Sequence, residues 1–455
     1  MHRLFSALTL GLALTACGGE EPAADNNNNN TPDAPALKTD KGVDADKKVI
    51  KIGALNDESG PAAVIGKPFA TGKRVLAAQV NAGGSGLLPD GWTVELVERD
   101  HGYNPQSAVQ AYNEIAGDVL FVGTSFGTPN TLPLRPMLER DSLVAFPASL
   151  SSQMAEHENT PPLGPSYEVE ARRALDWIVS ENGTDGVKLG IVYQQDDYGQ
   201  DGLDGWKAQA ELQGLTVASE QAIAPGQKDF TAVVTGLKEA GATHVLLTTL
   251  PSATGPIVGT AAQLGFGPTW IGNTPSWIDA FFVPEVIPSA VFGNFYWVQA
   301  LPYWGEDVAG MTAFTQAFDE HKGDANPDFY VLLSYVQGIT QLEAARQAIE
   351  GGDITRAGYL SALHGLTDFD AGGFLQPLDL SEVPYTAGTK TRILKPDFEA
   401  KSWTVVAAYA APKTETGHTR AEDQMSDIKA KRAGTKAAKT EAGNASPAAN
   451  RAGRK

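Results

Sequence analysis

A strand, a polar loop and a helix follow one another within residues 49–84, and this unit constrains the fold more than any other feature of the chain. It opens with Val-Ile-Lys-Ile-Gly-Ala-Leu, a mostly apolar run that is typical of a strand buried in a parallel sheet. Residues 56–61 combine Asn, Asp, Ser, Gly and Pro and predict a turn. Apolar residues spaced three or four apart predict the helix that follows, and two glycines end it. In an open α/β sheet, small ligands bind at loops of this kind, where strands end.

The same unit recurs along the chain. Short apolar or alternating strands are expected near residues 92–98, 119–122 and 143–146, each followed by a loop of small polar residues. A second series of strands and helices begins near residue 167 and continues to about residue 274. Because strands and helices alternate in both series, the pattern predicts an α/β chain of two doubly wound lobes.

The first unit also resembles a known family. Val80-Asn81-Ala82-Gly83-Gly84 closely matches the helix ending in the leucine/isoleucine/valine-binding family of periplasmic substrate-binding proteins. Three later motifs are similar to that family as well: Asp-x-x-Tyr-Asn-Pro at 100–105, Asp-x-Tyr-Gly at 196–199 and Asp-Phe-Thr at 229–231. The resemblance spans about residues 49–409 and implies the type I periplasmic-binding-protein fold, whose two lobes are joined by a multi-strand hinge.

The expected lobe boundaries follow from these patterns. Lobe 1 is expected to contain residues 49–165 and 295–385, and lobe 2 residues 166–294 and 386–411. Residues 289–299 are interpreted as a strand that returns to lobe 1. Residues 329–349 show helical spacing and predict an amphipathic helix with one buried face. The resemblance places a last strand, at residues 403–409, in lobe 2.

The first residues have the pattern of a bacterial lipoprotein signal. Arg3 precedes a short apolar stretch, and Leu-Thr-Ala-Cys ends it at Cys17, the only cysteine of the 455 residues. Residues 1–16 are therefore expected to be a signal peptide, with Cys17 as the lipidation site. Residues 17–48 are expected to be a disordered tether, because Asn, Ala, Pro and Asp dominate them. The prediction places the protein outside the cytoplasm, on a membrane of the bacterial cell envelope.

The charge distribution argues against some partners. Without residues 1–16 the chain keeps 34 Lys and Arg against 54 Asp and Glu, which disfavours nucleic acid as a partner. Residues 412–455 differ from the rest, since basic residues exceed acidic ones there and apolar residues are scarce. This segment is expected to be a basic, disordered tail, with contact to wall polymers or lipid headgroups as an open alternative.

The sequence supports an enzymatic function less well than it supports ligand binding. Residues 123–127 read Gly-Thr-Ser-Phe-Gly, which is the Gly-x-Ser-x-Gly pattern of a hydrolase nucleophile and would make Ser125 reactive. A catalytic histidine should follow, and only His364 lies in a suitable loop context. The His and Cys residues lack the spacing of a metal site, so no metal is expected. The sequence also lacks a glycine-rich phosphate-binding loop, so no cofactor is expected. The chain is therefore interpreted as a binding protein and not an enzyme, with a serine hydrolase as a minor alternative.

The resemblance implies a ligand site at the ends of the strands in both lobes. Each implied residue could instead serve as an ordinary turn or helix cap. The residues implied to bind the ligand are Ser59, Gly60, Ile65, Ser125, Thr128, Ala148, Ser149, Tyr198, Leu250, Ser252 and Thr274.

Two positions depart from the family pattern. Leu150 stands where relatives carry a threonine, and Thr274 stands where amino-acid-binding relatives place a carboxylate for the ligand ammonium. A buried ammonium without a partner would be costly, so an amide, a carboxylate or an aromatic acid is at least as good a candidate as an amino acid. Four acids could replace the missing carboxylate, although none occupies the matching position: Asp57, Glu58, Asp196 and Asp279.

The resemblance implies the function as well. The expected role is capture of a small organic molecule by closure of the two lobes, followed by delivery to a membrane permease of the ATP-binding-cassette (ABC) type. A sensor subunit of the same fold, which presents its closed state to a receptor, is the alternative.

Overall fold

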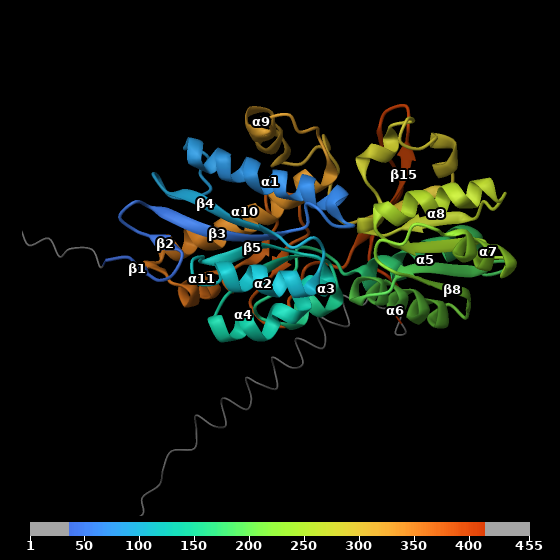
Figure 1. Cartoon of the computed structure of the whole chain (residues 1–455), viewed down its shortest axis with the longest axis horizontal. Coiled ribbons are helices and arrows are strands. Elements are labelled where there is room, and N and C mark those ends of the chain that lie inside the picture. Colours follow the sequence, from blue (N-terminus) through green and yellow to red (C-terminus); the bar gives the residue numbers. More distant parts are fainter. Residues whose placement is uncertain (1–35, 415–455) are drawn as a thin grey trace, which may run out of the picture. The chain divides into compact units, whose positions relative to one another are not determined.

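In the computed structural model of the chain, residues 36–414 are described, and their two large sheets, whose central strands are parallel, carry helices on both faces (Figure 1). In the first sheet β3 (Val49–Asn56) lies between β4 (Thr93–Asp100) and β5 (Phe121–Phe126), and β6 (Ala145–Ala148) pairs with β5. All of these pairings are parallel. The predicted first unit is thus the centre of the first lobe.

Two groups of helices cover the first sheet. One face packs against α1 (Ala63–Ala82) and α10 (Phe329–Glu350), and the other against α2 (Pro105–Ile115) and α4 (Arg135–Asp141). Because β3 is covered on both faces, it is apolar along most of its length. The other elements of this lobe are α3 (Thr128–Thr131), α9 (Met311–His321), α11 (Arg356–Leu363), β1 (Lys38–Thr39), β2 (Val43–Asp44), β12 (Asp353–Ile354), β13 (Thr367–Phe369) and β14 (Leu378–Asp379).

The second sheet is larger and mixed. Its strand order is β16, β15, β11, β10, β9, β7, β8, with antiparallel pairing only among β11, β15 and β16. These strands are β7 (Leu189–Gln194), β8 (Val217–Ile223), β9 (His244–Thr248), β10 (Thr269–Gly272), β11 (Phe295–Gln299), β15 (Thr391–Asp397) and β16 (Ser402–Ala410).

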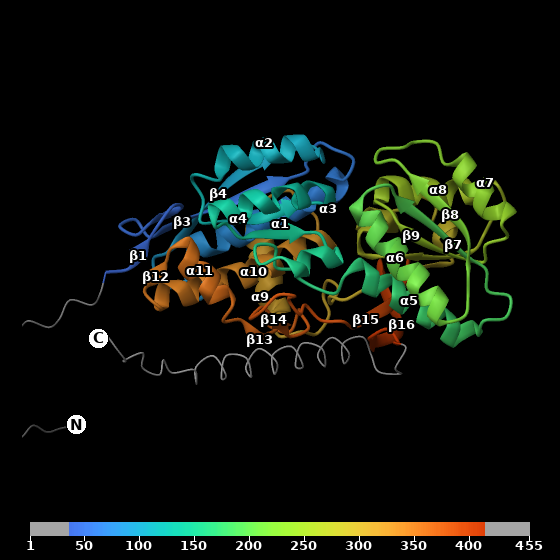
Figure 2. The same cartoon turned by 90° about the horizontal axis from the view of Figure 1, so that it is seen from below.

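Helices cover both faces of the second sheet too. The α5 and α6 helices share one apolar cluster with it, and α7 and α8 share another (Figure 2). Their bounds are α5 (Tyr167–Asn182), α6 (Asp197–Leu212), α7 (Thr231–Glu239) and α8 (Pro251–Gln263). Short 3-10 helices occupy Leu132–Leu134, Ser152–Glu156, Thr274–Ser276, Asp279–Phe282 and Ser289–Phe292. The predicted fold, two doubly wound α/β lobes, is confirmed.

The predicted lobe boundaries need three corrections. Residues 289–299 do not return to lobe 1, because β11 pairs with β10 and β15 in the second sheet. Residues 37–48 are not a free tether, since β1 pairs with β12 and β2 pairs with β3. The last described residues also belong to lobe 2, because the Lys413 N–H donates to the Asp176 Oδ2 atom at 2.6 Å. The predicted last strand of lobe 2 is confirmed as β16.

The long helix α10 differs from the amphipathic helix that the sequence predicts. Its side chains are buried around most of its circumference between Phe329 and Ala345. A helix that is buried on most sides is a core helix, and α10 carries buried polar side chains such as Gln337 and Gln341 among its apolar ones. It packs against α1, and both helices share an apolar cluster with the first sheet.

Within residues 36–414 the chain passes between the lobes three times, after β6, after β11 and after β14. Both lobes belong to one compact unit that begins at Leu37. Near the first crossing, the Asp201 carboxylate accepts hydrogen bonds from the Ser152 N–H, the Ser152 hydroxyl and the Glu168 N–H. No helix of this described part is both long and apolar enough to cross a bilayer.

Candidate ligand-binding site

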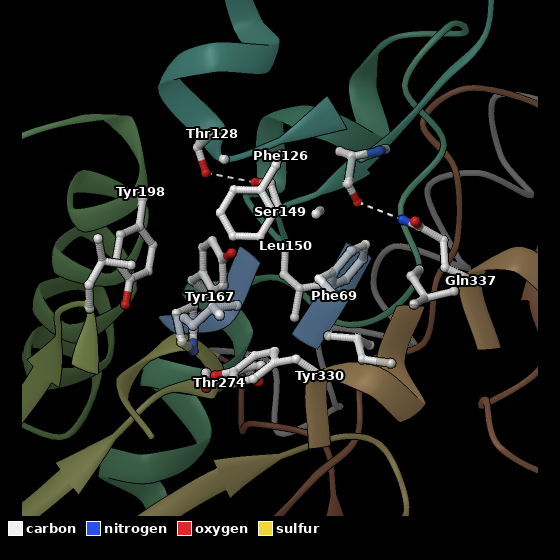
Figure 3. A pocket seen from close by; sticks show the side chains of 18 of the residues that line it. Phe69, Phe126, Thr128, Ser149, Leu150, Tyr167, Tyr198, Thr274, Tyr330 and Gln337 are labelled. Atoms are coloured by element: carbon white, nitrogen blue, oxygen red, sulfur yellow. Dashed lines mark hydrogen bonds between the residues drawn. The ribbon is translucent and has the colours of Figure 1, made fainter. Parts of the chain in front are cut away.

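The loops that follow the strands of both sheets meet at a cavity between the lobes (Figure 3). It contains about 590 Å³ of space free of protein atoms, including the part that is open to solvent. Side chains from lobe 2, such as Tyr198, lie on one side in this view, and Gln337 from lobe 1 lies on the other. The lining residues are Ile65, Phe69, Tyr103, Phe126, Gly127, Thr128, Pro147, Ala148, Ser149, Leu150, Leu163, Tyr167, Tyr198, Leu250, Thr274, Pro275, Tyr330, Leu333 and Gln337.

Most of the residues that the sequence implies for the site line this cavity. They come from the start of α1, from the ends of β5 and β6, and from the loops after β7, β9 and β10. Local caps position them: for example, the Asp196 side chain accepts the Gly199 N–H and thereby starts α6 beside Tyr198. The implied residues that line the cavity are Ile65, Thr128, Ala148, Ser149, Tyr198, Leu250 and Thr274.

Four implied residues do not line it. Ser59 and Gly60 lie in the loop after β3, where the Gly60 N–H donates to the Asp57 carboxylate at 2.6 Å. A Cβ at Gly60 would sit 2.3 Å from the Gly102 carbonyl oxygen, so this glycine is needed for loop packing. Ser252 instead joins the lobes, because its hydroxyl donates to the Pro61 carbonyl at 3.0 Å.

Ser125 is the fourth. It lies inside β5 and not in the loop after it, and its side chain is buried. Its hydroxyl contacts the Thr131 hydroxyl at 2.8 Å. A threonine hydroxyl cannot act as a general base, so this geometry does not activate Ser125 in the way a hydrolase requires.

Aromatic rings make up much of the lining, and most of them are absent from the set that the sequence implies. Phe69 follows Ile65 by one helical turn, so the helical spacing of α1 is a usable signal for it. Tyr103 belongs to the Asp-x-x-Tyr-Asn-Pro motif, which marks the family but by itself does not assign the ring to the site. Phe126 packs edge-on against both of these rings. Tyr167 and Tyr330 carry no local signal, because they come from α5 and α10, far along the chain.

The hydroxyl groups of the cavity are mostly bonded to protein. The Thr128 and Ser149 hydroxyls contact each other at 2.7 Å (Figure 3). The Tyr330 hydroxyl donates to the Thr274 and Trp277 carbonyls, each at 2.8 Å. The two bonds of Tyr330 hold its ring in place. Together, these contacts leave few polar atoms of the lining free to bind a ligand.

Thr274 lines the cavity, but its N–H and hydroxyl groups donate to a side chain that does not. Its N–H donates to the Glu170 carboxylate at 3.0 Å, and its hydroxyl donates to the other oxygen of the same group. Glu170 is fully buried on α5, and burial raises its pKa to about 8 even though both hydrogen bonds lower it. The sequence patterns do not point to Glu170. It is an acid next to the position where the resemblance implies one, but it does not line the cavity.

The other candidate acids are also committed elsewhere. Asp57 accepts the Gly60 and Ala62 N–H groups, Asp196 caps α6, and Asp279 accepts the Phe329 N–H. Glu58 pairs with Arg74 at 2.7 Å. Among the residues that the structure describes, those lining the cavity include no charged side chain.

Two lobes with a ligand-sized cavity at their strand ends define a two-lobed solute-binding protein. A family model described as periplasmic binding protein matches residues 49–401, so the chain belongs to that family. The match covers both lobes and confirms the family resemblance seen in the sequence.

Individual relatives agree with this assignment. The chain is 25% identical over 320 residues to an "Amino acid binding protein" of Pseudomonas aeruginosa, which covers 68% of this chain and 81% of that one. A solved structure described as a fatty acid ABC transporter substrate-binding protein, from Thermomonospora curvata, is 26% identical. That comparison has a TM-score of 0.76 and covers 83% of this chain and 95% of the other.

A third comparison concerns the fold alone. A branched-chain amino acid ABC transporter structure from Thermus thermophilus, described with bound valine, has a TM-score of 0.70 and 19% identity. It covers 80% of this chain and 97% of the other. The arrangement of the two lobes is therefore shared with that protein.

Proposed function

We propose that this protein captures a small organic molecule with an apolar body and no positive charge, and delivers it to an ABC-type membrane permease. One observation carries the proposal: a cavity between the lobes is lined by aromatic and aliphatic side chains without any carboxylate. A ligand ammonium would lose its hydration there and gain no counter-charge, which is costly. Amides, aromatic acids and aliphatic carboxylates fit this lining better than free amino acids do.

The two relatives support different ligands, and the lining favours one of them. The Pseudomonas relative is named for amino acids, and the Thermomonospora structure for a fatty acid. Four tyrosine and two phenylalanine rings offer a large apolar contact surface, which suits a hydrocarbon chain or an aromatic ring. We therefore favour a ligand with substantial apolar area.

Lobe closure is part of the proposal. Both lobes supply lining residues, so a ligand gains its full contacts only when the lobes come together. Contacts between the lobes support a closed arrangement: Ser252 bonds to Pro61, and the Gln194 amide donates to the Tyr103 hydroxyl at 3.4 Å. The ligand would select this closed state over an open one.

Anchoring is proposed from the sequence. Cys17 lies outside the described residues, and its lipidation stays a prediction, as do the signal peptide and the position on the bacterial cell envelope. The basic tail likewise lies outside from residue 415 onward.

A thermal-shift screen tests the proposed function. The purified protein, produced without residues 1–17, would be heated with single amino acids, primary amides, aromatic acids and aliphatic acids, each in excess. A ligand that binds only the folded state raises the melting midpoint by mass action. We expect acids and amides to raise the midpoint more than amino acids of similar size. A larger rise with leucine or valine would contradict the proposed ligand class and leave solute capture intact.

A further inference from the structure

A buried lysine lies behind the cavity wall. Lys73 on α1 is 3% exposed, and its Nζ atom donates to the Gln341 Oε1 atom at 3.0 Å. Within the described chain, residues 36–414, no carboxylate forms a salt bridge with it. Burial lowers its pKa to about 7, and no counter-charge opposes that shift. A buried cation without an anion is uncommon in proteins, because the charge loses hydration and nothing offsets the loss.

Lys73 on α1 and its partner Gln341 on α10 each lie one helical turn beyond a residue that lines the cavity. Phe69, which lines the cavity, precedes Lys73 by four residues on α1, and Gln337, which also lines it, precedes Gln341 by four residues on α10. Side chains four residues apart lie on the same face of a helix. The Lys73 Nζ atom also lies 3.4 Å from the place where a Cβ on Gly338, the residue after Gln337, would stand. Lys73 therefore lies about one helical turn further into lobe 1 than Phe69 and Gln337, which line the cavity.

Gln337 lines the cavity one helical turn before Gln341, the hydrogen-bond partner of Lys73. Its amide nitrogen donates to the Pro147 carbonyl at 2.9 Å (Figure 3), but its Oε1 atom is buried and has no hydrogen-bond partner among residues 36–414. Such an unpaired acceptor costs free energy. The Gln337 side-chain amide is therefore held by one hydrogen bond. A rotation of this side chain would break only that bond, because its oxygen makes none among the described residues.

The Gln341 amide is held more firmly. It accepts from Lys73 and donates to the Gly123 carbonyl at 2.7 Å, so both of its polar atoms are bonded. A Cβ at Gly123 would lie 2.9 Å from the Gln341 Oε1 atom, so a larger residue there would disturb this arrangement. Gln341 therefore keeps the Lys73 ammonium facing α10 at the level of Gly338.

We propose that Lys73 is the anion-binding residue of the cavity: an acid places its apolar body among the aromatic rings and its carboxylate on the Lys73 Nζ atom, with the Gln337 amide turned aside. This proposal rests on the proposed function and specifies where the ligand's charge is bound. A carboxylate would supply the counter-charge that the lysine lacks, through a charge-assisted hydrogen bond in a dry environment. The Thr128 and Ser149 hydroxyls, which already bond to each other, then need not hold the charge.

Pairs of acids and amides of equal length test this proposal. Isothermal titration would compare phenylacetate with phenylacetamide, and octanoate with octanamide, on the wild type and on Lys73→Met. We expect the wild type to bind each acid about tenfold or more tightly than its amide, because a charge-assisted bond is worth more than a neutral one. Lys73→Met should lose this preference while its affinity for the amides stays within about threefold.

Lys67→Met is the matched control. Lys67 lies on the same helix, is exposed, and carries the same charge, so this variant should keep the preference of the wild type for acids. Lys73→Gln serves as a second variant, because it removes the charge and keeps a donor for Gln341. Lys73→Met removes the buried charge and also leaves the Gln341 Oε1 atom without its donor, so the ligand-free melting midpoints of both variants are measured to show that each one folds.

The outcomes separate this proposal from the proposed function. If Lys73→Met and Lys73→Gln keep the preference for acids while Thr128→Val loses it, the hydroxyl pair holds the carboxylate and the Lys73 proposal is overturned. Binding of valine or leucine without binding of any acid would also overturn it, but solute capture would stand. If no acid, amide or amino acid binds the wild type, both the proposed function and the Lys73 proposal are overturned.

Discussion

The Tyr198 hydroxyl donates a hydrogen bond to the Asn273 Oδ1 atom at 2.8 Å, and this contact joins the start of α6 to the loop that follows β10. The hydroxyl also lies 3.3 Å from the Thr249 carbonyl. Tyr198 is buried and packs edge-on against Tyr167. Its ring, and not its hydroxyl, is therefore the part available to a ligand.

Removal of that hydroxyl should separate folding from binding. Tyr198→Phe should lower the free energy of unfolding by about 1 kcal/mol, the net value of one hydrogen bond, and leave ligand affinity within about threefold. Tyr198→Leu should weaken binding as well, because it removes the ring surface. Denaturant unfolding and calorimetric titration would measure the two effects. An equal loss of affinity in both variants would show that the hydroxyl contacts the ligand.

Ser125 offers a test of the structural role that its contacts assign to it. Ser125→Ala removes the hydroxyl contact with Thr131, whose own hydroxyl keeps the Ser125 and Gly127 carbonyls as acceptors, so the free energy of unfolding should fall by at most about 1 kcal/mol while ligand affinity stays the same. This differs from the expectation, drawn from the sequence alone, that Ser125 binds the ligand. Covalent labelling of Ser125 by a fluorophosphonate would contradict both interpretations and support a hydrolase.

The sequence predicts the frame of the molecule well, because strand and helix periodicity and turn residues are local signals. It places β3, the loop after it and α1 correctly, and seven of the eleven residues that it implies for ligand binding line the cavity between the lobes. The assignment of β11 fails because an isolated apolar strand carries no information about its partner, and only packing brings it beside β10. The positions of Tyr330 and Lys73 escape prediction for a related reason: Tyr330 lines the cavity and Lys73 bonds to Gln341 only because helices from distant parts of the chain meet.

The predicted lipidation of Cys17 would attach the protein to a membrane, and this attachment can be tested. Cys17→Ser should yield a protein that is recovered as an unprocessed precursor or in the fraction without membranes, because acyl chains supply the binding to the bilayer. Fractionation followed by immunoblotting measures this. The ligand affinity of the variant should match that of the wild type, and a variant that is cleaved yet stays with the membrane would contradict lipidation at Cys17.

Two helical glycines should respond in opposite ways to the same substitution. A Cβ on Gly72 would lie 2.2 Å from the Val331 carbonyl oxygen, so Gly72→Ala should force α1 away from α10 and lower the free energy of unfolding by roughly 1–3 kcal/mol. A Cβ on Gly259 of α8 would have no neighbouring atom from residues 36–414 within 4 Å beyond its own helix turn, so Gly259→Ala should raise the free energy of unfolding by up to about 1 kcal/mol through helix propensity. Denaturant titration compares the two. Equal effects would show that the contact between α1 and α10 is looser than the structure has it.

Glu170 should make stability depend on pH with a definite sign. Its ordinary pKa is 4.5, and burial raises the pKa in the folded protein to about 8. Between these values the folded state keeps a proton that the unfolded state has released, so this residue lowers the free energy of unfolding as pH rises from about 4.5 to about 8. Glu170→Gln cannot ionise and can still pair with Thr274, so its unfolding free energy should fall less over that range. Glu181→Gln, on the exposed end of the same helix, is the control and should follow the wild type. Urea titrations at pH 5, 6, 7 and 8 measure the slopes, and parallel curves for the wild type and Glu170→Gln would show that Glu170 is ionised in the folded protein throughout.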